Sequence, residues 1–154
     1  MMQYRPPLCL LSLLLLSGLL VPFSAPARAS EGAMVELQLS GLRSSDGMVR
    51  ICLTADKRYF PNCTNDPDAR HLTIAAAHAT HLRFDALPVG HYALSVIHDE
   101  NGNGKLDTRL GVPREGFGFS NNAKALFGPP SFRSASFAVQ GSSVIQAVTV
   151  RYIF

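Results

Sequence analysis

The sequence of 154 residues has almost no helical hydrophobic period, no internal repeat and no low-complexity tail. These absences argue against a helical bundle, a repeat architecture and a disordered extension. No basic stripe interleaved with aromatic residues is present, so we expect no nucleic-acid partner. No Cys-x-x-Cys motif is present either, and a thiol redox site is not expected. What the sequence does contain is a series of short segments in which apolar and polar residues alternate.

Residues 1–29 are typical of a cleavable secretory signal. Arg5 gives a positive start, residues 8–21 form an apolar run, and Ala27-Arg28-Ala29 predicts cleavage before Ser30. The run is shorter than the roughly 20 residues that a membrane-spanning helix needs, so we expect no transmembrane span in the mature chain. The prediction is an exported protein, periplasmic or secreted, with one domain at residues 30–154. Retention of the run as an anchor is the alternative.

Removal of this signal would take Cys9 away and leave two cysteines, Cys52 and Cys63. In an oxidising compartment, two such residues most simply form one disulfide bond. Closing so short a loop would stabilise the fold by about 3 kcal/mol. Cys52 faces away from the apolar residues of its predicted strand, so the bond is expected to hold residues 55–63 over the outer face or an edge of a sheet.

Alternating apolar residues predict seven strands, at residues 35–39, 49–53, 71–76, 81–86, 91–98, 134–139 and 144–154. Turn residues 44–47 predict that the first two strands form a hairpin. Seven short, regularly spaced strands favour an all-β fold, a single antiparallel β-sandwich. Residues 99–133 contain no convincing strand. A short helical turn is expected within them, near residues 122–126. Their four phenylalanines predict a long ordered loop that packs on the sandwich.

The start of this loop contains the most concentrated group of polar side chains. Its oxygen-bearing residues match positions one, three, five and nine of a calcium loop, and glycine stands at the sixth position. The predicted ligands are Asp99, Asn101, Asn103, the Lys105 carbonyl and Asp107.

This match to a calcium loop is incomplete at position twelve, where Leu110 replaces the expected bidentate glutamate. Either Asp107 binds the ion directly, or Glu115 returns from further along the loop, or the site is weak. The alternative is a metal-free polar turn, because two Asn-Gly pairs also favour tight turns and aspartate often hydrogen-bonds nearby amides.

Aromatic and polar side chains later in the loop predict a ligand or partner surface, made of Phe117, Phe119, Ser120, Asn121 and Asn122. A small hydrolase with Ser120 as nucleophile and His98 as base is the competing prediction. No nucleophile elbow surrounds Ser120, so an enzyme is not favoured. A zinc or copper site at His78 and His81 is disfavoured, because residues three apart on a strand point to opposite faces.

Four blocks of sequence together carry a resemblance to a known family: residues 87–93 (Leu-Pro-Val-Gly-His-Tyr-Ala), 98–107, 116–123 and 127–132. They resemble the bacterial family named domain of unknown function (DUF) 2141. The resemblance implies a bacterial envelope or secreted protein and brings no established activity. The first block is also similar to transthyretin-like and collagen-adhesin B-type sandwiches, which often serve as stalks or binding modules. The resulting hypothesis is a binding or structural module of the cell envelope for an unknown protein or envelope ligand; a ligand-free architectural domain is a further alternative.

Overall fold

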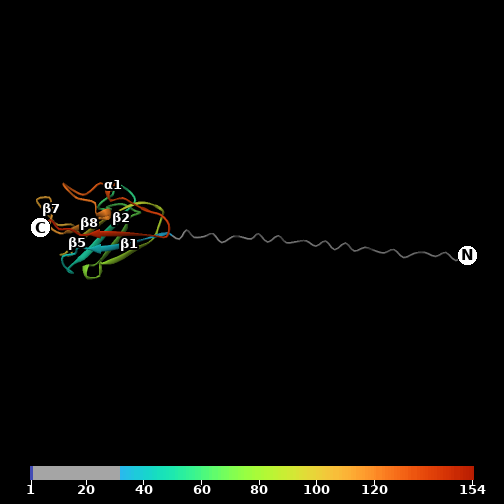
Figure 1. Cartoon of the computed structure of the whole chain (residues 1–154), viewed down its shortest axis with the longest axis horizontal. Coiled ribbons are helices and arrows are strands. Elements are labelled where there is room, and N and C mark those ends of the chain that lie inside the picture. The colour runs from blue at the N-terminus through green and yellow to red at the C-terminus, as the bar shows by residue number, and fades with distance from the viewer. Residues whose placement is uncertain (2–31) are drawn as a thin grey trace.

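The alternation of apolar and polar residues produces a β-sandwich of two main sheets (Figure 1). The structure is a computed structural model that describes Met1 and residues 32–154, so the predicted signal peptide, apart from Met1, lies outside the described residues. The elements are β1 (Ala33–Ser40), β2 (Met48–Thr54), β3 (Arg70–Ala75), η1 (Ala76–His78), β4 (His81–Leu87), β5 (Gly90–Asp99), β6 (Thr108–Arg109), β7 (Val112–Pro113), β8 (Gly116–Phe119), η2 (Ser120–Asn122), α1 (Phe132–Ala135), β9 (Phe137–Val139) and β10 (Ser143–Thr149).

One sheet has the strand order β10-β1-β4, and the other has the order β3-β2-β5-β8. β9 pairs with the first residues of β5, while β6 and β7 form a separate small hairpin. Alternate side chains of both sheets meet in one core, whose fully buried members include Val35, Leu37, Val49, Leu53, Leu94, Val96 and Val148. The predicted all-β sandwich is therefore confirmed.

The pairing of the strands differs from the prediction in two respects. β1 and β10 run parallel, with Met34 opposite Ser143 and Ser40 opposite Thr149, whereas the other ladders among residues 32–154 are antiparallel. The predicted hairpin at residues 44–47 is wrong, because β1 pairs with β4 and β10 while β2 pairs with β3 and β5. Residues 41–47 instead cross between the sheets. Alternation identifies a strand and its buried face, but it does not specify the neighbouring strand.

Two predicted segment assignments are also corrected. The predicted strand at residues 134–139 begins as the short helix α1, because the Ser131 hydroxyl accepts from the amide of Ser134 and caps it. Only β9 at its end is a strand. Conversely, the loop predicted at residues 99–133 contains β8, which pairs with β5.

Glycine and phenylalanine alternate along β8, and the glycines explain how this strand packs against the C-terminal segment. Gly116 and Gly118 face inward, and a Cβ atom there would lie 2.5 Å from the Tyr152 ring and 2.9 Å from Cγ1 of Val148, respectively. The glycines thus allow β10 and the following C-terminal residues to lie directly against β8. Phe117 and Phe119 point to the opposite, outer face of the larger sheet.

The outer face of the larger sheet is partly covered by the segment that follows β2. The predicted disulfide between Cys52 and Cys63 is present, with a Cα–Cα distance of 6.0 Å. Ser95 Oγ, on β5, donates to the Pro61 carbonyl over 2.6 Å. Both contacts hold this segment over the outer face, as predicted. Within residues 32–154, no helix has the length and apolar character needed to cross a membrane.

Candidate functional site

The polar loop after β5 is built around the buried carboxylate of Asp99, the last residue of that strand. Asp99 has no solvent-exposed surface. Its Oδ1 accepts from the amide of Asn103 at 3.0 Å, and its Oδ2 accepts from the amide of Gly104 at 2.8 Å and from Nε of Arg50 at 2.7 Å. The carboxylate therefore folds the loop back onto β2, through backbone amides that would otherwise be unpaired.

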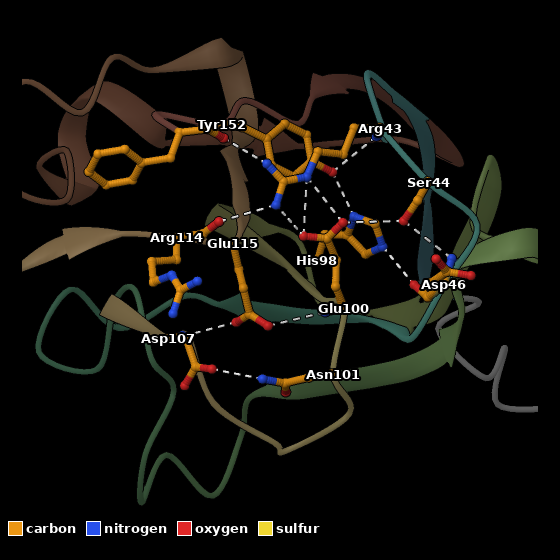
Figure 2. A network of polar contacts seen from close by, with 11 residues as sticks. Arg43, Ser44, Asp46, His98, Glu100, Asn101, Asp107, Arg114, Glu115 and Tyr152 are labelled. Carbon is orange, nitrogen blue, oxygen red and sulfur yellow. Dashed lines mark hydrogen bonds and ion pairs between the residues drawn. The ribbon is translucent and has the colours of Figure 1, made fainter. Parts of the chain in front are cut away.

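The next polar residues form a second layer at the surface. The side-chain amides of Asn101 and Asn103 donate to the two oxygens of Asp107, at 2.7 Å and 2.9 Å (Figure 2 shows the Asn101 contact). Oδ1 of Asn101 accepts from the amide of Asn103, and Oδ1 of Asn103 accepts from the amide of Lys105. The three side chains thus meet, but the groups directed at Asp107 are donors rather than oxygens.

Glu115 returns to this loop, as one of the three predicted arrangements required, and it binds backbone amides. Its two carboxylate oxygens accept from the amide of Glu100 at 3.2 Å and from the amide of Asp107 at 2.9 Å (Figure 2). Within residues 32–154, no three His, Cys, Asp or Glu side chains are placed to share one metal ion. Among the described residues, the contacts that close the loop are these hydrogen bonds and the ion pair of Asp99 with Arg50.

The protonation of two loop carboxylates follows from these contacts. Burial raises the pKa of Asp99, but the hydrogen bonds from Arg50, Gly104 and Asn103 outweigh this effect and hold the pKa below its ordinary value. The amides of Asn103 and Asn101 lower the pKa of Asp107. Both groups are therefore ionised at neutral pH.

A second polar network joins this loop to the C-terminus (Figure 2). Arg43 donates to both oxygens of Glu100, lies over the ring of Tyr152 at 4.3 Å from its centroid, and donates to the Phe154 carbonyl at 2.7 Å. The hydrogen bond from Arg43 lowers the pKa of Glu100, so this pair is charged at neutral pH. These contacts hold the last residues of the chain against the loop.

His98 is fully buried in this network and has a structural role. Nε2 lies 2.8 Å from the Asp46 carbonyl, which can only accept, so Nε2 carries the proton. Burial raises the pKa of Tyr152, and its hydroxyl lies at a hydrogen-bond distance of 2.6 Å from Nδ1, the other ring nitrogen of His98. Both ring nitrogens are thus used within the fold.

The residues of η2 are also occupied by backbone groups. Ser120 is fully buried, where its hydroxyl donates to the Ala135 carbonyl and accepts from the amide of Leu94. Leu94 lies four residues before His98 on β5, which corresponds to about 13 Å along a strand. The amide group of Asn121 donates to the Ser136 carbonyl, and that of Asn122 donates to the Ala147 carbonyl and accepts from the amide of Thr149. Of the predicted recognition surface, Phe117 and Phe119 line an open cavity.

That cavity is a cleft of about 930 Å³ on the outer face of the larger sheet. Side chains from all four strands form its floor, including Arg50 and Cys52 of β2, His71 and Thr73 of β3, Ser95 and Ile97 of β5, and Phe117 and Phe119 of β8. Three segments form its walls: residues 61–64, held by the disulfide, residues 104–113, which contain the β6–β7 hairpin, and residues 125–129. The size falls in the usual range of small-molecule sites.

Large apolar side chains gather around this cleft without being buried. Leu126, Phe127 and Ile153 line it, and they are 77%, 105% and 53% exposed. Leu110, at the tip of the β6–β7 hairpin, is 97% exposed and has a φ of 51°, which is unfavourable for a leucine. Exposed apolar groups gathered in one place are typical of a contact surface rather than of an ordinary exterior.

The charge of the cleft lining is of one sign. Arg50 and Lys105 are its charged residues, and no aspartate or glutamate lines it. Asp107 lies between two lining residues, Leu106 and Thr108, but does not line the cleft itself, and its carboxylate accepts hydrogen bonds from Asn101 and Asn103. The Arg50 guanidinium gives Nε to Asp99; among the described residues, its two terminal nitrogens have no protein acceptor.

Sequence reasoning missed most of this cleft. Arg50 and Thr73 are ordinary polar positions of alternating strands, and nothing in their own segments indicates that the loops after β5 and β8 fold over them. Phe127 is one of the four loop phenylalanines expected to pack on the sandwich, but its side chain is exposed. The sequence does offer one signal for exposed apolar residues here. Leu126 and Phe127 directly precede Gly128-Pro129-Pro130, which does not continue a strand.

The family comparison agrees with the resemblance described for the four blocks of sequence. The family described as "Uncharacterized protein conserved in bacteria (DUF2141)" matches residues 37–146, which include most of both sheets and the entire polar loop. The chain belongs to the DUF2141 family. No curated protein and no solved structure matches it. The transthyretin-like likeness remains a prediction, and membership of the DUF2141 family assigns no activity.

Proposed function

We propose that this DUF2141 protein is an exported binding module of the bacterial envelope, and that it takes its ligand in the cleft on the outer face of the larger sheet. The gathering of exposed apolar side chains around a cleft of about 930 Å³ carries this proposal. An architectural domain without a ligand gains nothing from leaving Leu126 and Phe127 in water, because each loses the free energy that burial would give. Export rests on the features of the first 29 residues.

The walls of the cleft suit binding more than catalysis. Ser120 and His98, the pair expected in a hydrolase, are both fully buried. Each is saturated by partners within the fold, and neither lines the cleft. The polar side chains that do line the cleft are two cations, an imidazole, the amide of Asn62 and several hydroxyls, from the sheet and from the loops around it. They can orient a ligand by charge and hydrogen bonds.

The experiment is a titration of the purified protein with the neutral apolar dye N-phenyl-1-naphthylamine. We expect saturable enhancement of dye fluorescence, with one site per chain. Thr73→Trp, on the exposed edge strand β3, should fill the cleft and weaken dye binding at least tenfold. His81→Trp, on β4 at an edge of the other sheet, is the matched control and should leave binding unchanged. Equal binding by both variants, or none by the parent protein, would remove the proposal.

A weak calcium site in the loop after β5 is the second candidate. The convergence of Asn101 and Asn103 on Asp107 favours it, because rotating each amide by 180° would turn two carbonyl oxygens toward the carboxylate. Two carbonyl oxygens and the two carboxylate oxygens would then lie close together, as a hard cation requires. Each rotation also breaks the hydrogen bond that Oδ1 accepts from a backbone amide, and Asp99 would have to share its oxygens between the ion and Arg50. The expected dissociation constant is therefore in the range of roughly 0.1 to 1 mM found for extracellular modules.

Calorimetry with calcium and magnesium tests this site. Calcium binding should give a measurable heat with that dissociation constant and raise the melting temperature. Magnesium should bind more weakly and raise the melting temperature less. Asp107→Asn, at the surface, should abolish the response and keep the fold. A melting temperature indifferent to both calcium and chelator, with no heat of binding, would leave the loop as a metal-free turn.

A further inference from the structure

From the chemistry of the cleft we infer the class of its ligand: a single-chain amphiphile with a carboxylate head, such as a free fatty acid. This inference rests on the proposed function, since it assumes that the cleft is a binding site. It adds a requirement for negative charge on the ligand. It also assigns the two ends of the ligand to different parts of the cleft.

The head of the ligand is assigned to the region of Arg50 and Lys105. Gly104 lies directly beside the guanidinium, since a Cβ atom there would be 3.7 Å from Nη2 of Arg50. Arg50 and Lys105 therefore reach the cleft from adjoining positions. Nε of Arg50 is held by Asp99, which fixes the plane of the guanidinium and leaves its two terminal nitrogens for an incoming acceptor. Two parallel N–H groups match the two oxygens of a carboxylate.

The positive charge of this region is not cancelled from within the cleft. Asp99 compensates one charge of the Arg50–Lys105 pair, and in the part of the chain that the structure describes Lys105 makes no ion pair. With no acidic side chain in the lining, a bound cation would meet repulsion and no partner. His71, on β3, adds a further hydrogen-bonding group that also lines the cleft.

The body of the ligand is assigned to the apolar side chains. Ile97 and Phe117 stand on the floor, and Leu126, Phe127 and Ile153 line the cleft in exposed positions. An apolar chain would cover side chains that otherwise contact water, at roughly 25 cal/mol for each Å² removed from solvent. A small inorganic anion would leave all of them exposed, so charge alone does not explain the lining.

The test compares three ligands with the same ten-carbon chain as competitors of the bound naphthylamine dye, each below the concentration at which it aggregates. Decanoate should displace the dye at a concentration at least tenfold lower than 1-decanol does. Decyltrimethylammonium should be the weakest competitor. Lys105→Gln should weaken the binding of decanoate at least threefold and leave the binding of 1-decanol unchanged. Lys124→Gln, which removes a lysine outside the lining, is the matched control and should change neither. Added salt should weaken decanoate alone, because it screens the charge interaction.

The outcomes separate this inference from the proposed function. Dye binding with equal displacement by decanoate and 1-decanol would overturn the carboxylate requirement and leave the binding module standing. Absence of dye binding would overturn both. Sedimentation of the protein with anionic phosphatidylglycerol vesicles, without any displacement by monomeric decanoate, would overturn the inference in favour of docking on a membrane surface.

Discussion

At the scale of single residues, Asp99 has the most consequential contacts in the polar loop. Its buried carboxylate joins the end of β5, two backbone amides of the loop and Arg50 of β2. Through Arg50 it also orients a guanidinium that lines the cleft. One side chain therefore connects the folding of the loop to the chemistry of the proposed binding site.

Asp99→Asn should destabilise the protein at pH 7 by about 2 kcal/mol. The NH₂ group of the asparagine, placed at Oδ2, would face the Gly104 amide and Nε of Arg50, which are donors themselves. The folded-state pKa of Asp99 is below its ordinary value, so its ionisation stabilises the fold above about pH 4 and that contribution is lost as the pH falls through the folded-state pKa. The difference between variant and parent in urea unfolding should shrink below pH 4. Asp85→Asn, at an exposed site, is the control. An equal difference at pH 7 and pH 3 would contradict the lowered pKa.

At the scale of elements, β8 shows how two residue types alternate for two different purposes. Its glycines let the C-terminal segment approach on the inner side, and its phenylalanines form part of the cleft floor on the outer side. Pairing with β5 holds both in register. The strand thus positions the cleft from the middle of a segment that otherwise consists of loops.

Gly116→Ala should cost about 1–3 kcal/mol of stability, since its Cβ atom would lie 2.5 Å from the Tyr152 ring and 2.6 Å from Cγ1 of Val150. We expect faster amide exchange at Phe117 and Arg151, whose mutual hydrogen bonds join β8 to the C-terminal segment. Gly90→Ala is the matched control on β5, where the nearest atom would be 3.4 Å away. Unchanged amide exchange and an unchanged free energy of unfolding in Gly116→Ala would show that the C-terminal segment can shift at no cost in stability.

Elements that alternate plainly were predictable, and those shaped by distant contacts were not. β2 to β5 follow the expected ranges to within a residue or two at each end, because their side chains carry the period of a half-buried strand. β8 was missed because glycine has no apolar side chain to reveal its buried face. The hairpin at residues 44–47 was wrongly expected because turn residues also serve a crossing between sheets.

For the candidate site, local chemistry was predictable and assembly was not. Glu115 does contact the backbone amides of Glu100 and Asp107, while its expected role as an ion ligand stays a prediction. The spacing of oxygens could not show that the amide nitrogens of Asn101 and Asn103 face Asp107. The cleft depends on three segments folding over one sheet face, which no single segment encodes.

At the scale of the whole molecule, the last residues complete the fold. The family match ends at residue 146, whereas the buried Val148 and Val150 and the hydroxyl of Tyr152 that binds His98 all follow it. Deletion of residues 147–154 should remove about 3–6 kcal/mol for the two valines alone and leave Nδ1 of His98 without its partner. That loss is comparable to the total stability of many domains. Circular dichroism should show no cooperative melt. A sharp transition near that of the parent chain would show that the C-terminal segment is dispensable.

The parallel pairing of β1 with β10 has a consequence for the order in which the protein can mature. Ser40 and Thr149, which face each other at one end of that ladder, are 109 residues apart in the chain. Synthesis proceeds from the N-terminus, so this flank of β1 has no neighbour until β10 has been made. Such distant closure slows folding. Under the proposed export, slow folding would lengthen the time during which the chain can be threaded through a translocation channel.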